Sequence, residues 1–187
     1  MYLKQKIQAV NRVFMQADTH VSSFRKRSGL ACPPACGVCC FKSDIQATVL
    51  EFLPAAYELY LNGKTLEILE KLEKRSDNIC VFYDPTGEGG CCSEYACRGL
   101  VCRLFGYSKR NDRQGNPALV TCRLIKELAE SSRNDIKLTL APNISDYYLK
   151  LFGIDPDLSI KYLPVNRAVR KALEIVLLDL QYRKKPA

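Results

Sequence analysis

The stretch Ala31-Cys-Pro-Pro-Ala-Cys-Gly-Val-Cys-Cys-Phe-Lys42 holds four cysteines within nine positions. Proline and glycine between the cysteines favour a tight loop, which can turn several sulfur atoms toward one point. Buried, inert cysteine is the ordinary alternative, but it does not explain this density. We therefore interpret Cys32, Cys36, Cys39 and Cys40 as candidate metal ligands, with the remaining ligands supplied from distant parts of the chain.

A second group of cysteines follows the loop: Cys80, Cys91, Cys92, Cys97, Cys102 and Cys122. The chain has ten cysteines but a single histidine, His20, so a metal site would consist almost wholly of thiolates. Thiolate ligands favour zinc or an iron–sulfur cluster over calcium or magnesium. The first residues lack the apolar run of a secretory signal, and we expect a cytoplasmic protein whose cysteines stay reduced.

Cys39 and Cys40 are neighbours, and extended backbone would point their side chains in different directions. The sequence therefore predicts that they serve different metals, or that one ligates and the other supports the site. Three further cysteines are followed directly by arginine, in Cys97-Arg98, Cys102-Arg103 and Cys122-Arg123. We expect these guanidinium groups to lie beside the thiolates and offset their negative charge.

The composition describes a globular chain. Of its 187 residues 47% are hydrophobic and 26% charged, which excludes a disordered or collagen-like protein. No uncharged apolar run approaches the roughly 20 residues of a membrane helix, so we expect no membrane association. The net charge of +8 is uneven, because residues 31–92 are acidic and the flanking regions are basic. This balance permits an acidic partner such as nucleic acid without specifying one.

Apolar residues recur at steps of three and four over residues 2–27, which predicts a long amphipathic helix. The apolar positions are Ile7, Val10, Phe14, Ala17, Val21 and Phe24. Packing against the body of the domain is the ordinary interpretation of this stripe, and a dimer or protein-partner seam is the alternative. Gly29 follows three basic residues and is expected to end the helix.

The remaining pattern predicts short elements. Ser43 or Asp44 is expected to cap a helix that runs to Asn62 and is kinked at Pro54. A charged helix over 64–76 would bury Leu66, Leu69 and Leu72. The other expected elements are a strand at 79–83 with a turn at 84–90 that makes a hairpin, a polar loop at 109–117, a helix over 119–131, a short helix near 145–152, and a final helix beginning at Pro164.

Together these elements predict a mainly α fold with a short β-hairpin. The chain would be a small single domain, with long loops organised around one or two cysteine–metal centres. Residues 1–29 form the N-terminal helix of this scheme, residues 30–125 the cysteine-cluster region and residues 126–187 a helical C-terminal region.

Two segments of the sequence resemble the YkgJ-type cysteine-cluster family, a family of zinc- or iron-chelating domains. One is Cys36-Gly-Val-Cys39-Cys40, and the other runs from Cys92 through Tyr95, Arg98, Cys102 and Arg103 to Phe105 and Tyr107. Cys80-Val-Phe-Tyr and Cys122 also match, and the resemblance covers about residues 30–125. Gly99 departs from the proline usual there, Cys32 is one residue further from Cys36 than the plainest spacing, and Cys91 and Cys97 are additional.

The resemblance implies a ligand set and a group of supporting residues. The ligands would be Cys32, Cys36, Cys39, Cys40, Cys80, Cys92, Cys102 and Cys122. Tyr95, Arg98 and Arg103 would support the cofactor, which is an iron–sulfur cluster or zinc. Eight thiolates could form two four-coordinate sites, or one site with reserve or redox-active cysteines.

The family also includes proteins similar to flagellin lysine N-methylase, where the resemblance implies an iron–sulfur cluster. This chain shows no convincing adenosylmethionine loop, because its glycine-rich stretch 87–90 leads into cysteines and is better interpreted as a hairpin turn. The leading hypothesis is therefore a cytoplasmic metal-binding protein with no catalytic residue identified. Its alternatives are an iron–sulfur redox or methyl-transfer enzyme and a structural-zinc module that binds nucleic acid through its basic faces.

Overall fold

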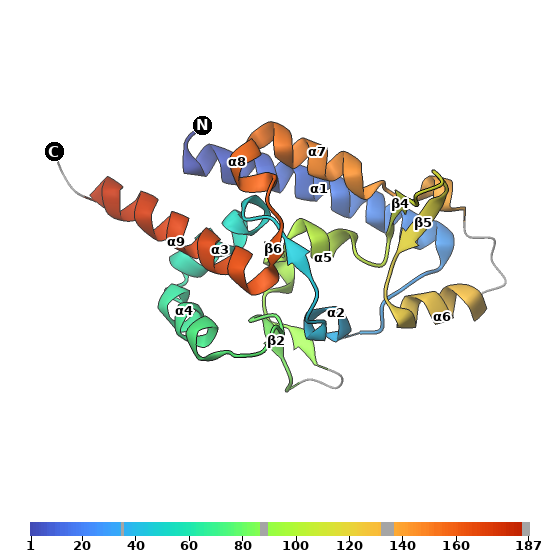
Figure 1. Ribbon diagram of the computed structural model, residues 1–187, viewed down its shortest axis with the longest axis horizontal. Coiled ribbons are helices and arrows are strands. Elements are labelled where there is room, and N and C mark those ends of the chain that lie inside the picture. Colours follow the sequence, from blue (N-terminus) through green and yellow to red (C-terminus); the bar gives the residue numbers. More distant parts are fainter. Residues whose placement is uncertain (35, 87–89, 132–136, 185–187) are drawn as a thin grey trace.

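The structure is a computed structural model that describes residues 1–34, 36–86, 90–131 and 137–184. In these residues α-helices predominate and are accompanied by three short antiparallel strand pairs (Figure 1). One hydrophobic cluster draws its side chains from the first helix, the middle of the chain and the last helix. The predicted fold class, mainly α with short hairpins, is confirmed.

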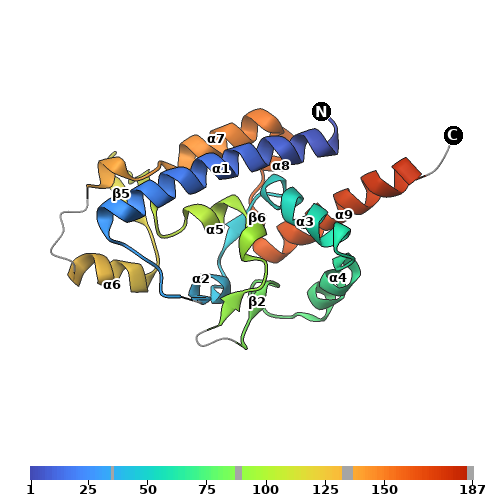
Figure 2. The ribbon, with the colours of Figure 1, turned by 180° about the vertical axis from the view of Figure 1, so that it is seen from behind.

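The first helix, α1 (Leu3–Ser28), buries the predicted apolar stripe inside the chain. It packs against α3 (Leu53–Leu61), α5 (Leu100–Leu104) and α7 (Ile144–Ile154). Figures 1 and 2 show α1 and α7 side by side along one edge of the molecule. The ordinary packing interpretation is therefore right, and the stripe is not free to form the dimer or partner seam. Gly29 ends α1 with a φ of 72°, which suits glycine.

The predicted helix from Ser43 to Asn62 is wrong in its first half. No helix begins at Ser43 or Asp44; instead β1 (Gln46–Ala47) pairs with β6 (Leu163–Pro164). A 3-10 turn, η1 (Leu50–Phe52), then leads into α3. Pro54 lies in the first turn of α3, where its missing N–H has no helical partner to lose, so it starts the helix and does not kink it.

Two further helices complete this side of the core. The helix α4 (Thr65–Lys74) buries Ile68 and Leu72, while Leu66, expected on the buried face, is 74% exposed. The buried residues of α4 are Thr65, Ile68 and Leu72, which lie on one face of the helix. Leu66 lies outside this face. The final helix, α9 (Val165–Lys184), begins just after Pro164 as predicted and packs along α3.

Two hairpins flank the cysteine-bearing segments. The first pairs β2 (Tyr83–Asp84) with β3 (Cys91–Cys92), a shorter strand than the predicted 79–83; its turn at residues 87–89 lies outside the described residues. The second pairs β4 (Ser108–Asn111) with β5 (Pro117–Val120), where a polar loop was expected. Asp112 accepts hydrogen bonds from the backbone N–H groups of Gln114 and Asn116, and this turn chemistry closes the hairpin.

The remaining elements are short. They are α2 (Val38–Phe41), η2 (Tyr95–Cys97), α6 (Arg123–Ser131), η3 (Leu138–Leu140) and α8 (Pro156–Ser159). The helix α6 begins four residues later than the predicted 119, because 117–120 belong to β5. The predicted short helix near 145–152 is confirmed as α7. Within the described ranges no helix combines the length and apolar character that crossing a membrane requires.

Candidate metal centre

Cysteines from four separate segments surround one small cavity of about 40 Å³. Residues of α2, of the segment before β2, of β3 and of α5 meet there, and Tyr95 and Arg98 complete the wall. Six of the eight predicted ligands line the cavity: Cys36, Cys39, Cys40, Cys80, Cys92 and Cys102. A second cavity of about 20 Å³ is lined by Cys39, Cys40, Cys80 and Cys102 together with apolar side chains. The fold thus gathers sulfur atoms that lie far apart in the sequence.

The backbone around Cys80 is fixed on several sides. Its own N–H donates to the carbonyl of Cys40 at 3.0 Å, and its carbonyl accepts from Arg75 at 2.9 Å. Asn166, in the first turn of α9, accepts from the N–H of Val81 and donates to the carbonyl of Ile79, each at 2.8 Å. The position of this sulfur therefore depends on both α2 and the C-terminal helix.

Hydrogen bonds between thiols dominate the electrostatics of the cavity. Interactions with the thiols of Cys39, Cys80 and Cys92, followed by burial, raise the pKa of Cys40. The interaction with Cys40 lowers the pKa of Cys39 to about 6, and it also lowers the pKa of Cys80 and of Cys92. Thiols gathered this closely suit a cation that takes the place of their protons.

Cys39 and Cys40 lie in the single turn of α2 and not in extended backbone. Both side chains nevertheless line the same two cavities. The turn begins at Gly37, where an added Cβ would lie 2.8 Å from the carbonyl carbon of Gly90. Glycine at this position lets α2 approach the β2–β3 hairpin closely, and in Figure 1 both lie on the same side of α5.

A second, outer group of thiols adjoins the first. Cys32 is hydrogen-bonded to Cys36 and lies close enough to Cys122 and Cys39 to sense their charge. Burial, followed by the bond to Cys36, raises the pKa of Cys32 to about 12. The N–H of Cys32 donates to the hydroxyl of Tyr107 at 2.7 Å, which ties the loop to the end of α5.

The two additional cysteines stand apart from these groups. Neither Cys91 nor Cys97 lines the two cavities. Cys91 is the strand partner of Asp84 in the β2–β3 hairpin. Burial raises the pKa of Cys97. Burial also raises the pKa of Cys102 well above its ordinary value, although Cys102 does line both cavities.

In the described residues no three cysteine, histidine, aspartate or glutamate side chains have the ready geometry of a metal site. The chemistry of the donor set nevertheless fits a thiophilic metal. Thiols hydrogen-bonded to one another need only lose protons and shift slightly to become tetrahedral ligands. Zinc or iron held there would draw its coordination from cysteine sulfur alone.

Arg98 and Tyr95 lie beside the sulfurs. The guanidinium of Arg98 stacks on the ring of Tyr95 at 3.9 Å and donates to the Tyr95 carbonyl at 2.8 Å. Its positive charge contributes to the lowered pKa values of Cys39 and Cys92, after the larger contribution of the Cys40 hydrogen bond. Arg98 also approaches Asp18 on α1 at 3.7 Å, so it connects the cavity wall to the first helix.

Arg103 is buried and acts on the backbone of the second cysteine segment. Its guanidinium donates to the carbonyls of Ala96 at 2.6 Å and Arg98 at 3.0 Å, and it also pairs with Asp18. These carbonyls belong to the 96–98 segment, so the hydrogen bonds of Arg103 reach backbone oxygen and not the thiolates. Arg103 therefore braces the chain between Cys92 and Cys102.

The third arginine of the series does not lie near the sulfurs. The side chain of Arg123 is 91% exposed and pairs with Glu127 one turn along α6. The expectation that all three cysteine–arginine pairs share one role is wrong for this one. Arg123 occupies the first position of α6, whose outer face points to solvent, while Arg98 and Arg103 lie between α1 and the cavity.

One functional residue escaped the sequence reasoning. Glu51 is fully buried and accepts hydrogen bonds from the N–H and hydroxyl of Thr48 and, at 2.7 Å, from the N–H of Val101. Burial raises the pKa of this carboxyl group despite these bonds. Glu51 thereby holds the start of α5, the helix that carries Cys102. At Gly99 an added Cβ would lie 3.0 Å from Glu51, which explains why a small residue stands there.

Clustered thiols from several elements, with arginines braced around them, define a cysteine-cluster metal-binding protein. Residues 31–123 match the CxxCxxCC family, described as "Putative zinc- or iron-chelating domain", and this part of the chain belongs to that family. Comparisons with curated proteins and with solved structures found no match. The family and the cysteine cavity together support metal binding by this chain.

Proposed function

We propose that the chain chelates zinc or iron through the eight cysteines Cys32, Cys36, Cys39, Cys40, Cys80, Cys92, Cys102 and Cys122. The observation that carries this proposal is the thiol cluster around Cys40, which lines one cavity together with Cys39, Cys80 and Cys92. A divalent ion in that position would satisfy several thiolates at once, and a metal ion is the usual counter-charge for such a set.

The cysteines divide into an inner and an outer group. The inner group is Cys39, Cys40, Cys80, Cys92 and Cys102, supported by their shared cavities. The outer group is Cys32, Cys36 and Cys122, supported by the contributions of Cys36 and Cys122 to the raised pKa of Cys32. The inner group holds five sulfurs and the outer group three. Two four-coordinate centres result if Cys39 belongs to the outer centre, and Cys39 does contribute to the raised pKa of Cys32.

The size of the cavities favours single ions over a cluster. Their volumes are about 40 and 20 Å³, where roughly 10–15 Å³ is enough to hold one water molecule. A cubane cluster would need the walls to move further apart than a single ion would, because a single ion needs only a shift of the thiols.

Metal and sulfide analysis of protein purified without oxygen tests this proposal. We expect zinc or iron without acid-labile sulfide, and loss of metal in Cys40→Ser but not in Cys97→Ser, a matched cysteine outside the cavities. A broad band near roughly 400 nm that dithionite bleaches would replace the mononuclear centre with an iron–sulfur cluster. Absence of bound metal, or equal loss in both variants, would contradict the proposal.

The proposal includes a reducing, cytoplasmic setting. All ten cysteines are free in the structure, and thiolate ligands need such a compartment unless a metal protects them. Alkylation of denatured, chelated protein should label all ten thiols without a reductant. Reproducibly blocked pairs in freshly prepared anaerobic protein would count against this setting.

A further inference from the structure

A second concave region lies apart from the cysteines. It is a cleft of about 430 Å³ bounded by the C-terminal half of α1, by α7 and by residues 139–143. This volume falls within the roughly 300–1,000 Å³ of typical small-molecule sites. The cleft shares no lining residue with the two cysteine cavities, so it needs a separate explanation.

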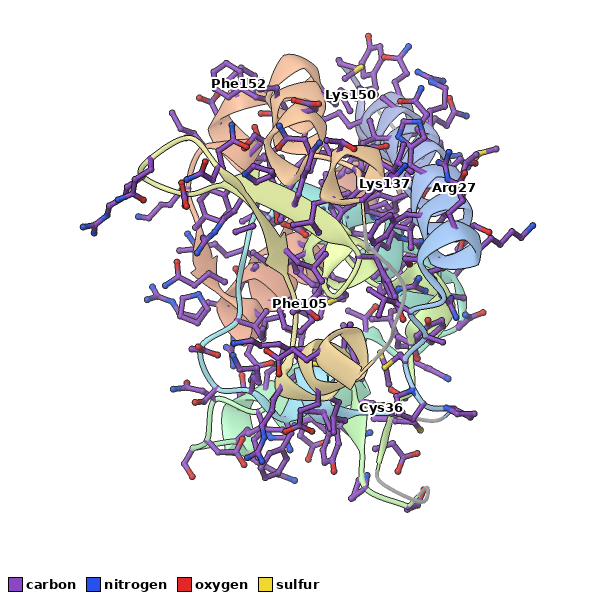
Figure 3. All side chains as sticks on the ribbon, turned by 90° about the vertical axis from the view of Figure 1, so that its right-hand side faces the viewer. Arg27, Cys36, Phe105, Lys137, Lys150 and Phe152 are labelled. Atoms are coloured by element: carbon purple, nitrogen blue, oxygen red, sulfur yellow. The ribbon has the colours of Figure 1, made fainter. Side chains whose placement is uncertain are left out.

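The charged side chains around the cleft are predominantly basic. Arg27, Lys109 and Lys150 line it together with His20, while Asp146 is the single acidic residue in the lining. Figure 3 shows Arg27 on α1 and Lys150 on α7 on the same part of this face, with Cys36 toward its opposite end. The cleft therefore carries positive charge contributed by three separate elements.

Neutral partners hold two of these cations. Lys150 donates to the side-chain oxygen of Gln16 at 2.7 Å and lies 5.0 Å from the centre of the Tyr147 ring. Lys109 donates to the carbonyl of Thr139 at 3.0 Å. Among the ion pairs of the described residues, none involves Arg27, Lys109 or Lys150. Their charges are thus oriented around the cleft but not neutralised.

Arg27 and Tyr147 complete the arrangement. The guanidinium of Arg27 donates to the hydroxyl of Ser23, which leaves most of its donors unused. Tyr147 is buried, and its hydroxyl lies 2.5 Å from Nδ1 of His20. Because Nδ1 of His20 is engaged by the Tyr147 hydroxyl, Nε2 is the ring nitrogen that can meet a ligand at the cleft.

We propose that this cleft binds a small phosphate monoester. A phosphate dianion accepts several hydrogen bonds and matches a guanidinium fork combined with ammonium groups. The cleft is larger than the phosphate group alone, so it has room for the organic part of the ligand. A concave site of this volume favours a small molecule over the extended backbone of a nucleic acid.

Calorimetric titration of the metal-loaded full chain with AMP and with inorganic phosphate, at constant ionic strength, tests the proposal. The variant is Arg27→Gln/Lys150→Gln. Its control is Lys4→Gln/Arg12→Gln, which removes the same charge from exposed positions of α1 outside the cleft. Both replaced pairs are exposed, and thermal unfolding checks that each variant folds.

AMP should bind the native chain and the control alike, and bind the cleft variant at least ~10-fold more weakly, because charge-assisted hydrogen bonds are lost. If inorganic phosphate also binds, and binds the cleft variant more weakly by the same factor, this would support a phosphate site. If the native chain binds inorganic phosphate more weakly than AMP, this would support contacts to the organic part of AMP. Equal weakening in both variants, or binding of a single-stranded oligonucleotide with none of AMP, would overturn the proposal.

Discussion

The helical core and the cysteine region are held together by different means. The helices α1, α3 and α9 bury long runs of apolar side chains, and Val10, Leu53 and Leu173 are fully buried. The loop 31–42 contributes Cys40 to that core, and the four strand residues of the β2–β3 hairpin are only half-buried. Apolar burial alone therefore stabilises the first region, whereas the second needs another source of order. The cavity forms where the two regions meet.

The segment 91–108 modifies this contrast. It belongs to the cysteine region, yet Leu100 and Leu104 of α5 are fully buried. Cys102 is thus carried by the helical core, while Cys36, Cys39 and Cys92 are carried by the loop and the hairpin. Metal binding would join the less stable region to the more stable one.

Metal removal should have the largest effect on this contrast. Structural zinc contributes about 10–16 kcal/mol in small peptides, and a loss of even ~5 kcal/mol here would lower Tm by roughly 10–20 °C. We expect chelation, or Cys36→Ser, to lower Tm and to speed hydrogen exchange in 31–42 and 83–92 before α1 or α9. An unchanged Tm in metal-free protein would refute the structural role of the metal.

Truncation of the core should produce the opposite pattern. Leu173 is fully buried in α9, and Leu173→Ala should cost about 2–5 kcal/mol of unfolding free energy through the cavity it leaves. Denaturant unfolding would measure this loss, and metal content should stay at the native value. Loss of metal in the folded variant would show that the two regions are not separable in this way.

Removal of Arg103 should weaken metal retention without unfolding the core. The side chain braces the carbonyls of Ala96 and Arg98, and loss of such an outer partner typically costs about 10–100-fold in metal affinity. Competition with a chelator would measure the change in Arg103→Ala. Arg103→Lys should not restore retention, since an ammonium cannot reach both carbonyls and Asp18 with a fork of donors.

Two arginines provide controls for that experiment. Arg123→Ala also removes an arginine next to a cysteine, but from a side chain that is 91% exposed. Arg113→Ala removes an exposed arginine of the β4–β5 turn. Both should retain metal as the native chain does. If metal retention falls equally in Arg103→Ala, Arg123→Ala and Arg113→Ala, the effect comes from net charge.

The smallest effect is expected at the cysteines outside the cavities. Cys91→Ser and Cys97→Ser should leave the metal content unchanged, because neither sulfur lines a cavity with the others. Elemental analysis of the purified variants measures this. Loss of one metal equivalent in either variant would show that the ligand set differs from the eight proposed.

Sequence periodicity predicted the long elements well and the short ones poorly. The helix α1 was predictable because its stripe repeats over about five turns, from Ile7 to Phe24, and Gly29 marks its end. Pro54 was misinterpreted because proline occurs both at helix starts and at helix kinks, and the β1–β6 pairing decides between them. The β4–β5 hairpin was missed because β4 is polar and the apolar end of β5 was assigned to the predicted helix over 119–131.

The sequence also showed which residues could form a site but not where they meet. Cysteine density indicated the ligands, whereas the contacts of Glu51 and Asn166 depend on tertiary packing that no local pattern records. Arg98 and Arg123 look alike in sequence, and burial alone separates them. The basic cleft was invisible for the same reason, since it joins α1 to α7 across more than 100 positions.

The hydrogen bonds of Asn166 to the backbone beside Cys80 can form only once α9 has been synthesised. The two partners Val81 and Asn166 are 85 residues apart, so at ~5–20 residues per second the ribosome needs roughly 4 to 17 s to deliver the second after the first. During that interval the five cysteines from Cys91 to Cys122 are translated, but Cys80 still lacks its final anchor. Asn166 also lies beyond the matched span 31–123. A nascent chain would therefore acquire its metal at the end of translation, and thiols awaiting it would depend on the reducing power of their surroundings.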